Sequence, residues 1–535
     1  MTRPGPAQVA AWLAGDPDPG TRAELQQLME AGTAGAAAEL ADRFAAPLAF
    51  GTAGLRGPLR AGPNGMNRAV VRRAAAGLAA FLNDTGRPGA VVVGYDARHG
   101  SAGFARDTAA VIQAAGRPAR LLPEALPTPV LAYAVRHLGA AAGVMVTASH
   151  NPPADNGYKV YLGDGAQIVP PADREIEAAI AAVGPAIDVP CDESYEVLGG
   201  ELAASYVTLV AHLVPAGPRD LTIAYTALHG VGAAVARDVF AAAGFPPMHV
   251  VAEQAEPDPD FPTVAFPNPE EPGATDLLLA LAAQVGADLA IANDPDADRC
   301  AVAVGGRLLT GDELGVLLAD HLLSRHQRPT GAFATTIVSS SLLTKICVRH
   351  GVSYAETLTG FKWIVRADDH LAFGYEEAMG YAVAPDLVRD KDGISAALLI
   401  AEMAAGLKEQ GLTLLDRLDS MAAEYGLHAT DQLSVRVDDV TVIATAMAQV
   451  RQRPPAHLLG RPVTTVDDLL PQADVVRLRA DGVRVVVRPS GTEPKLKAYL
   501  EVVVPIGATP VAVARADAAG QLATLRADMA AALGI

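Results

Sequence analysis

Residues 141–153 read AAGVMVTASHNPP, an apolar run that turns polar within one residue. The run from Ala141 to Val146 predicts a buried strand, because it is short and apolar and ends at turn-forming residues. Ligands of α/β sheets bind at the carboxyl ends of strands, so Ser149 in the following turn is the first candidate for the centre of the chemistry. A plain polar turn ended by two prolines is the alternative interpretation of TASHNPP.

The same change from an apolar strand to a polar loop recurs along the chain. Strands are predicted at 90–95, 221–226, 288–292 and 483–487, and Ala- and Leu-rich helical stretches separate strands of this kind. Such alternation is typical of α/β domains with parallel sheets. Residues 7–45 carry apolar positions at three- and four-residue spacing, which predicts a helical N-terminal extension.

Composition excludes several classes of protein. The 535 residues allow three or four domains, and half of them are hydrophobic. The net charge of −18 argues against nucleic acid as a partner, because phosphate backbones need clustered Lys and Arg. Three separated cysteines exclude a disulfide framework. No signal peptide or long apolar segment is evident, so we expect a cytoplasmic protein with no membrane partner.

Residues 294–299, DPDADR, place three carboxylates at alternate positions. Asp294, Asp296 and Asp298 can converge on one point from an extended or looped backbone. Three anions repel each other unless a cation neutralises them, and oxygen-only ligands select a hard ion such as Mg²⁺. A solvated acidic turn is the alternative. The apolar runs on both sides of the segment predict a loop pinned between two buried strands, which favours a metal site.

Residues 488–495, RPSGTEPK, contain the side chains that bind phosphate. A guanidinium can bind phosphate in a bidentate manner, hydroxyls donate hydrogen bonds, and a glycine lets backbone N–H groups face an anion. A plain Gly/Pro turn is the alternative interpretation. The chain has no Walker A sequence, which disfavours nucleotide triphosphate chemistry of that type. The candidate ligands are Arg488, Ser490, Gly491, Thr492 and Lys495.

Residues 373–381, FGYEEAMGY, place Glu376 beside Glu377 between glycines. From a loop, both carboxylates can accept hydrogen bonds from neighbouring sugar hydroxyls. The alternative is a helix start with acidic residues in its first turn. Upstream, the sequence TGFKW offers a second small-residue turn, with Thr359, Gly360 and Lys362.

Together these segments resemble the α-D-phosphohexomutase superfamily, the phosphoglucomutases and phosphomannomutases. TASHNPP, DPDADR, YEEAMG and RPSGTEPK are similar, in that order, to the family's phosphoserine, metal, sugar and phosphate loops. The resemblance extends from about Phe50 to about Tyr499. The N-terminal helices, TALHGVG at 226–232 and the GYEEAMGY form of the sugar loop are most similar to the branch with phosphoglucomutase-2 and phosphopentomutase.

The resemblance implies an α/β fold with four domains around a central cleft. Three domains would contain mixed α/β sheets, and the fourth would be a smaller C-terminal α+β domain. The expected boundaries are 1–205 for the helical extension and phosphoserine domain, 206–325 for the metal domain, 326–428 for the sugar domain and 429–535 for the phosphate domain.

The resemblance also assigns roles to individual residues. Ser149 would carry the phosphoryl group, and Ser149 with Asp294, Asp296 and Asp298 would bind one Mg²⁺ per chain. Lys159 would be the general base, for which burial beside other cations would have to lower its pKa. His150 and Arg56, the latter in FGTAGLRG at 50–57, would lie near the nucleophile. The implied substrate-binding residues are Arg299, Thr359, Gly360, Lys362, Glu376, Glu377, Arg488, Ser490, Gly491, Thr492 and Lys497.

The implied activity is that of an isomerase acting on a small sugar phosphate. It would interconvert α-D-glucose 1-phosphate and glucose 6-phosphate through a phosphoserine and a bisphosphorylated sugar, with glucose 1,6-bisphosphate as activator. A monomer or homodimer is expected. Phosphopentomutase or phosphomannomutase activity is the alternative, although Ala378 replaces a serine and Tyr381 a histidine of relatives that handle mannose.

Two further classes of protein fit parts of the sequence. A Mg²⁺-dependent sugar phosphatase would use Asp294 as its nucleophile, and a non-catalytic sugar-phosphate binding protein would need no nucleophile beside a metal loop. The second acid/base residue of a mutase has no candidate in the sequence.

Overall fold

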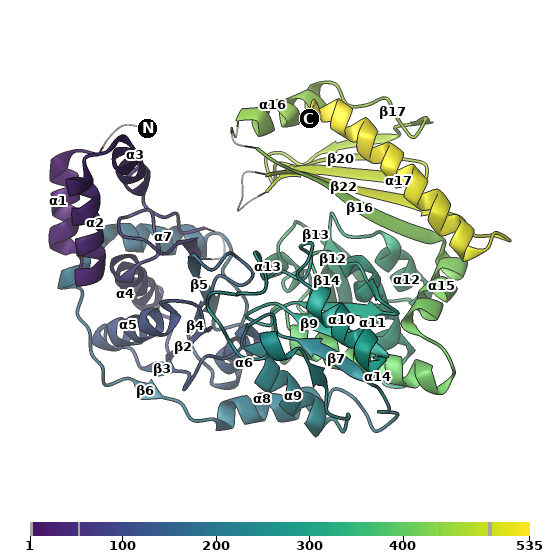
Figure 1. Ribbon diagram of the computed structural model, residues 1–535, viewed down its shortest axis with the longest axis horizontal. Coiled ribbons are helices and arrows are strands. Elements are labelled where there is room, and N and C mark those ends of the chain that lie inside the picture. The colour runs from purple at the N-terminus through teal and green to yellow at the C-terminus, as the bar shows by residue number, and fades with distance from the viewer. Residues whose placement is uncertain (1–3, 52–53, 438, 440, 491–494) are drawn as a thin grey trace. The chain divides into compact units, whose positions relative to one another are not determined.

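The computed structural model describes residues 4–51, 54–437, 439, 441–490 and 495–535 (Figure 1). The chain divides into two compact units. The first unit comprises residues 1–309 and 380–406, and the second comprises residues 310–379 and 407–535.

The first unit begins with three helices, as the spacing of apolar residues at 7–45 predicts. They are α1 (Pro6–Gly15), α2 (Pro19–Ala31) and α3 (Ala34–Arg43). The side chains of Asp18 and Thr33 accept hydrogen bonds from the first turns of α2 and α3, which satisfies backbone donors that a helix start leaves open. An apolar cluster joins these helices to the following loop, and its members are Val9, Leu25, Leu40, Phe44 and Ala61.

The next sheet carries the serine loop. Its strand order is β1-β5-β4-β2-β3-β6, in which β4, β2, β3 and β6 run parallel and β5 is antiparallel to both of its neighbours. Every residue of β4 is buried, which explains its uninterrupted apolar sequence. The strands are β1 (Gly54–Pro58), β2 (Val91–Tyr95), β3 (Ala119–Leu121), β4 (Ala142–Val146), β5 (Asp155–Leu162) and β6 (Glu196–Val197). The helices are α4 (Arg68–Asp84), α5 (Ser101–Ala114), α6 (Thr128–His137) and α7 (Ala172–Ala182), with a short 3₁₀ turn η1 (Ala186–Asp188).

A second sheet in the same unit carries the acidic loop. Its order is β11-β10-β9-β7-β8, with β8, β7 and β9 parallel and with β10 and β11 antiparallel to their neighbours. Residues 294–299 connect β9 to β10, whose residues are all buried. The strands are β7 (Ile223–Thr226), β8 (His249–Val250), β9 (Leu289–Asn293), β10 (Cys300–Val304) and β11 (Arg307–Leu308). The helical elements are α8 (Glu201–Ala211), α9 (Gly232–Ala242), η2 (Ala252–Gln254) and α10 (Asp276–Val285).

Residues 380–406 complete the first unit. They contain β15 (Gly380–Ala382) and most of α14 (Gly393–Glu409).

The second unit contains a third α/β sheet, in which β13, β12 and β14 are parallel. Helix α11 begins with a capping box, in which Thr310 and Glu313 satisfy each other's backbone N–H groups. The strands are β12 (Ala332–Thr336), β13 (Tyr354–Thr357) and β14 (Leu371–Glu376). The helices are α11 (Gly311–Ser324), α12 (Leu342–His350), α13 (Phe361–Ile364) and α15 (Leu414–Tyr425).

The C-terminal part of the second unit is the expected smaller α+β sheet. Its order is β16-β22-β21-β20-β19, antiparallel throughout, and α17 lies lengthwise across one face (Figure 1). The strands are β16 (Leu427–Arg436), β19 (Thr465–Asp468), β20 (Val476–Ala480), β21 (Val483–Pro489) and β22 (Lys495–Val504), with a separate hairpin of β17 (His457–Leu458) and β18 (Arg461–Pro462). The helices are α16 (Thr441–Gln452) and α17 (Val511–Leu533), and both contribute to the apolar core beneath them.

The architecture confirms the expected fold class of α/β sheets followed by a C-terminal α+β domain. Each predicted strand is present, with ends that differ by at most two residues. Within the residues that the structure describes, no helix combines the length and apolar character needed to span a bilayer.

Candidate active site

The loop after β4 places Ser149 against the acidic loop. Ser149 has a left-handed backbone angle, φ 53°, and is 3% exposed. Its backbone N–H donates to Thr147 Oγ1 at 2.8 Å, which holds the turn. Its hydroxyl donates to Asp294 Oδ2 at 2.7 Å, and Ser149 Oγ lies 3.0 Å from His150 Nδ1. The structure therefore brings the two loops singled out by the sequence into direct contact.

Guanidinium groups surround this loop. Burial, followed by the charges of Arg299 and Arg56, holds the pKa of His150 well below its ordinary value, so the imidazole is neutral at pH 7. Arg56 lies on β1, whose register pairs it with Gly157 of β5. Its Nη1 donates to Asn151 Oδ1 at 3.0 Å, so Arg56 contacts the loop that carries Ser149.

Arg98 holds the backbone of the serine loop, a contact that the sequence did not indicate. Its Nη2 donates to the carbonyl of Ser149 at 2.6 Å and to that of Asn151 at 2.5 Å. Its Nη1 donates to the carbonyls of Pro152 at 2.8 Å and Asp155 at 3.2 Å. One buried guanidinium thus satisfies four carbonyls that would otherwise lack partners, and it fixes the loop.

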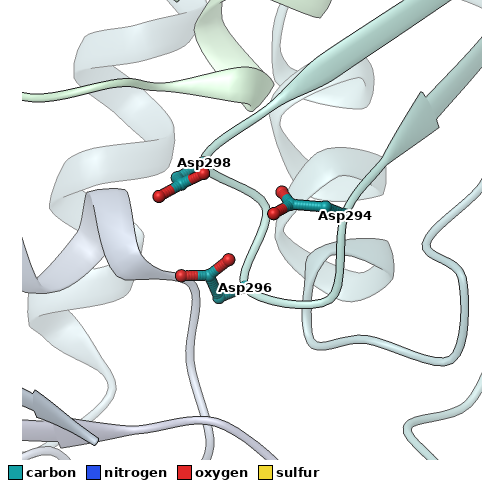
Figure 2. Close-up of side chains that lie close together, drawn as sticks. All are labelled: Asp294, Asp296 and Asp298. Atoms are coloured by element: carbon teal, nitrogen blue, oxygen red, sulfur yellow. The ribbon is translucent and has the colours of Figure 1, made fainter. Parts of the chain in front are cut away.

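The acidic loop forms a compact group of carboxylates (Figure 2). Asp294, Asp296 and Asp298 are buried, and one oxygen from each lies within 4.8 Å of the others. The short antiparallel connection from β9 to β10 turns through Ala297, which has a left-handed φ of 55°. The predicted convergence of the three side chains is therefore present.

The hydrogen bonds of these carboxylates leave room for a cation. Asp294 Oδ1 accepts from the backbone N–H of Arg299 at 2.9 Å. Lys159 Nζ donates to Asp296 Oδ2 at 2.6 Å and to Asp298 Oδ2 at 2.9 Å. The opposite oxygens, Asp296 Oδ1 and Asp298 Oδ1, are buried and have no hydrogen-bond partner among the described residues. Buried carboxylate oxygens of this kind fit a small hard cation.

Lys159 is the lysine that the resemblance predicts as a base. Burial disfavours its charge, but Asp296 and Asp298 outweigh burial and raise the pKa of Lys159 above its ordinary value. This direction is opposite to the lowered pKa expected from the sequence, because the neighbouring groups that dominate are anions rather than cations. Assignment of Lys159 as the base stays a prediction.

A second buried lysine lies at the same carboxylates. Lys391 Nζ is 3.3 Å from Asp298 Oδ2, in the segment between β15 and α14. The preceding residue, Asp390, accepts hydrogen bonds from Tyr161 Oη at 2.8 Å and from Gln167 Nε2 at 2.7 Å. These contacts anchor the segment that carries Lys391. The sequence RDKDG at 389–393 was its only signal, and it was not singled out.

Arg299 lies between the acidic loop and an exposed carboxylate. Its Nη1 is 3.4 Å from Glu270 Oε2, and its Nε is 4.0 Å from Asp298 Oδ1. The guanidinium is therefore near the carboxylate cluster, where the sequence places an anion-binding arginine.

The glutamate pair belongs to the second unit and begins at the end of a strand. Glu376 is the buried last residue of β14 and Glu377 follows it, so the alternative prediction of a helix start was wrong. Glu377 Oε2 accepts from Thr336 Oγ1 at 3.1 Å and from Ser339 Oγ at 3.2 Å. Its backbone N–H also donates to Ser339 Oγ at 3.2 Å. The two carboxylates therefore have different surroundings, and Glu377 is bound to hydroxyls of its own chain.

The TGFKW turn precedes helix α13 of the second unit. Gly360 has φ 116° at the helix start, a conformation that L-residues with a side chain rarely adopt. Lys362 is buried, with its Nζ 5.6 Å from the ring centroid of Trp363. The hydroxyl of Thr359 is buried without a hydrogen-bond partner in the part of the chain that the structure describes. This turn therefore offers a polar group to a ligand.

Part of the predicted phosphate loop lies outside the described residues, namely Gly491 and Thr492. Arg488 is in β21 and pairs with Lys497 of β22, so two cationic side chains are neighbours across the ladder. The backbone N–H of Ser490 donates to the carbonyl of Lys495 at 2.7 Å. These contacts bring the two ends of the loop together.

Comparison with known proteins identifies the family. The phosphoglucomutase/phosphomannomutase alpha/beta/alpha domains I, II and III match residues 47–185, 204–307 and 310–425, and the family's C-terminal domain matches residues 434–505.

Individual relatives carry three different substrate names. A "Probable phosphomannomutase" of Haemophilus influenzae is 47% identical, covering 82% of this chain and 93% of that one. A phosphopentomutase of Mus musculus is 35% identical over 94% and 90% of the two chains. A phosphoglucomutase of Staphylococcus haemolyticus is 35% identical over 85% and 90%.

A solved structure agrees with these relatives. A Thermus thermophilus protein named as a phosphomannomutase superposes with a TM-score of 0.72 at 28% identity, covering 89% of this chain and 99% of that one. The chain therefore belongs to the phosphoglucomutase/phosphomannomutase family, whose members are isomerases that transfer a phosphoryl group within a sugar phosphate.

Proposed function

We propose that this protein interconverts α-D-glucose 1-phosphate and glucose 6-phosphate, with Ser149 as the carrier of the phosphoryl group. The observation that carries the proposal is the contact between the buried Ser149 hydroxyl and Asp294, at 2.7 Å. A hydroxyl held at a cluster of three carboxylates suits phosphoryl transfer, in which positioning and charge compensation lower the barrier.

In the proposed cycle, phosphorylated Ser149 gives its phosphoryl group to the free hydroxyl of a bound sugar monophosphate. The bond from Ser149 Oγ to phosphorus breaks, a bond from the sugar oxygen to phosphorus forms, and the sugar hydroxyl releases a proton. The resulting bisphosphate turns over, and Ser149 takes back the other phosphoryl group. Lys159 and Lys391 are our candidates for holding the released proton, because both reach the same carboxylate cluster.

The proposed metal is one Mg²⁺ per chain, held by Asp294, Asp296, Asp298 and the phosphorylated Ser149. When bound, it offsets the negative charge of the phosphoryl group during transfer. The buried unpartnered oxygens of Asp296 and Asp298 support this ligand set. Arg98 would meanwhile keep the serine loop in place through its hydrogen bonds to the loop carbonyls.

We further propose that the second unit recognises the remainder of the sugar phosphate. Glu376 would bind sugar hydroxyls, and Arg488, Ser490 and Lys497, with Gly491 and Thr492, would bind the phosphate that is not transferred. Binding energy from that distal phosphate would position the reacting hydroxyl. Glucose 1,6-bisphosphate, the proposed activator, would phosphorylate Ser149 directly.

The choice of glucose rests on the sugar loop. Tyr381 stands where mannose-handling relatives have a histidine, and it is fully buried in β15, so it does not replace that imidazole as a ligand. Mannose is the second candidate substrate, favoured by the 47% identity to a "Probable phosphomannomutase". Comparison of kcat/KM for glucose 1-phosphate, mannose 1-phosphate and ribose 1-phosphate tests the choice. A higher value for mannose or ribose would reassign the substrate.

Covalent labelling tests the nucleophile. After incubation with glucose 1,6-bisphosphate and Mg²⁺, peptide mass spectrometry should find one phosphate on the Ser149 peptide, and Ser149→Ala should lack both the phosphate and mutase activity. A phosphatase with an aspartyl nucleophile predicts instead that Asp294→Ala alone abolishes the label. A binding protein without catalysis predicts no label and no turnover of any of the three sugar phosphates.

A further inference from the structure

Thr128, which the sequence did not single out, contacts the acidic loop through two hydrogen bonds. It is the first residue of α6 and is fully buried. Its Oγ1 donates to Asp296 Oδ2 at 2.6 Å, and its backbone N–H donates to the Asp296 carbonyl at 2.9 Å. One residue therefore fixes both the side chain and the backbone of Asp296.

These contacts determine which oxygen of Asp296 remains available. Asp296 Oδ2 accepts from Thr128 and from Lys159, each at 2.6 Å. Asp296 Oδ1 is buried and lacks a hydrogen-bond partner among the described residues. Rotation of the carboxylate would break two short hydrogen bonds in a site without solvent, so its orientation is held before any ligand arrives.

The position of Thr128 on its helix adds to this effect. The N-terminal end of an α-helix carries partial positive charge, which favours an anion nearby. Helix α6 spans ten residues, and its first backbone N–H donates to the residue whose carboxylate belongs to the cluster. The same contact ties the sheet that carries Ser149 to the loop that carries the carboxylates, both in the first unit.

We propose that Thr128 is a positioning residue of the metal site. It turns the carboxylate of Asp296 so that Oδ1 is presented to a divalent cation, and it fixes the acidic loop against α6. The inference rests on the proposed role of the three aspartates as metal ligands. Partners that orient metal ligands change metal affinity by about 10–100-fold when they are removed.

Metal binding without turnover tests the inference. Isothermal titration of the full chain with Mg²⁺, and with Mn²⁺ followed by electron paramagnetic resonance, should show about 10–100-fold weaker binding by Thr128→Val than by the wild type. Thr128→Ser keeps the hydroxyl and should bind within about threefold of the wild type. Thr108→Val is the matched control, because Thr108 is equally buried and its hydroxyl donates to the Phe104 carbonyl at 2.8 Å within α5.

Each outcome decides one question. Wild-type affinity in Thr128→Val, or an equal loss in Thr108→Val, would overturn the role of Thr128. An equal loss in Thr128→Ser would overturn it as well, because the hydroxyl is retained. Absence of metal binding by the wild type would instead reject the proposed metal site. If thermal unfolding shows that the valine chain does not fold, Thr128→Cys, a weak donor, takes its place with the same criteria.

Discussion

Asp312 should make the stability of the second unit depend on pH near neutrality. The carboxyl group is buried near the start of α11, where Asp312 Oδ1 accepts from the Ser340 backbone N–H at 2.6 Å and from Tyr375 Oη at 3.2 Å. Burial, reinforced by the charges of Glu377 and Glu501, raises the pKa of Asp312 to about 7. The Ser340 hydrogen bond and Arg484 oppose this shift without cancelling it. We therefore expect Asp312→Asn to change how stability varies with pH.

The direction follows from proton binding. Between the ordinary pKa of an aspartate, about 4, and the folded pKa, the folded chain binds the proton and the unfolded chain does not, so stability falls as pH rises. The loss between pH 5 and pH 8 amounts to about 2–3 kcal/mol, since one pKa unit corresponds to about 1.4 kcal/mol. Asparagine carries no such charge. The free energy of unfolding of Asp312→Asn, relative to the wild type, should rise by this amount over the interval and level off above pH 7.

Thermal unfolding of both proteins at pH 5, 6, 7 and 8 measures the effect. For domains of 150–250 residues, 1 kcal/mol shifts Tm by about 2–4 °C, so the Tm difference between variant and wild type should change by about 5–10 °C. Each protein is compared with itself across pH, which removes any constant effect of the amide. A Tm difference that is the same at all four pH values would refute the reasoning, and so would a change of opposite sign.

Three further substitutions test the two units. Glu377→Gln keeps the acceptor oxygen that Thr336 and Ser339 use and should change kcat/KM for glucose 1-phosphate little, whereas Glu376→Gln should lower it about tenfold or more; equal losses would contradict this distinction. Gly230→Ala would place a Cβ 2.2 Å from Pro295 Cα, so calorimetry should show weaker Mg²⁺ binding, and unchanged affinity would count against the packing argument. Arg98→Met leaves buried carbonyls unpaired and should lower the free energy of unfolding in urea by about 3–5 kcal/mol, and a loss below about 1 kcal/mol would show that the guanidinium is dispensable.

Local patterns in the sequence were sufficient to predict the strands and the loops that follow them. The apolar run before Ser149 and the alternating aspartates after β9 each describe a strand end through neighbouring residues. The same logic predicted the convergence of Asp294, Asp296 and Asp298, because residues two apart project to the same side.

Contacts between distant parts of the chain were not predictable in this way. Thr128 and Lys391 reach the carboxylate cluster from sequence positions far from it, and neither belongs to a motif of its own. The direction of the Lys159 pKa shift was wrong for the same reason. The shift depends on which charges surround the ammonium, and Asp296 and Asp298 come from another sheet of the fold.

The backbone of the serine loop restricts which alcohol can serve as the phosphoryl carrier. Ser149 has φ 53°, a region where β-branched side chains are rarely found because their second substituent on Cβ crowds the backbone. Threonine offers the same hydroxyl group, yet its extra methyl group would oppose the loop conformation that Arg98 holds. The choice between two chemically equivalent nucleophiles is thus made by the main chain and not by their reactivity.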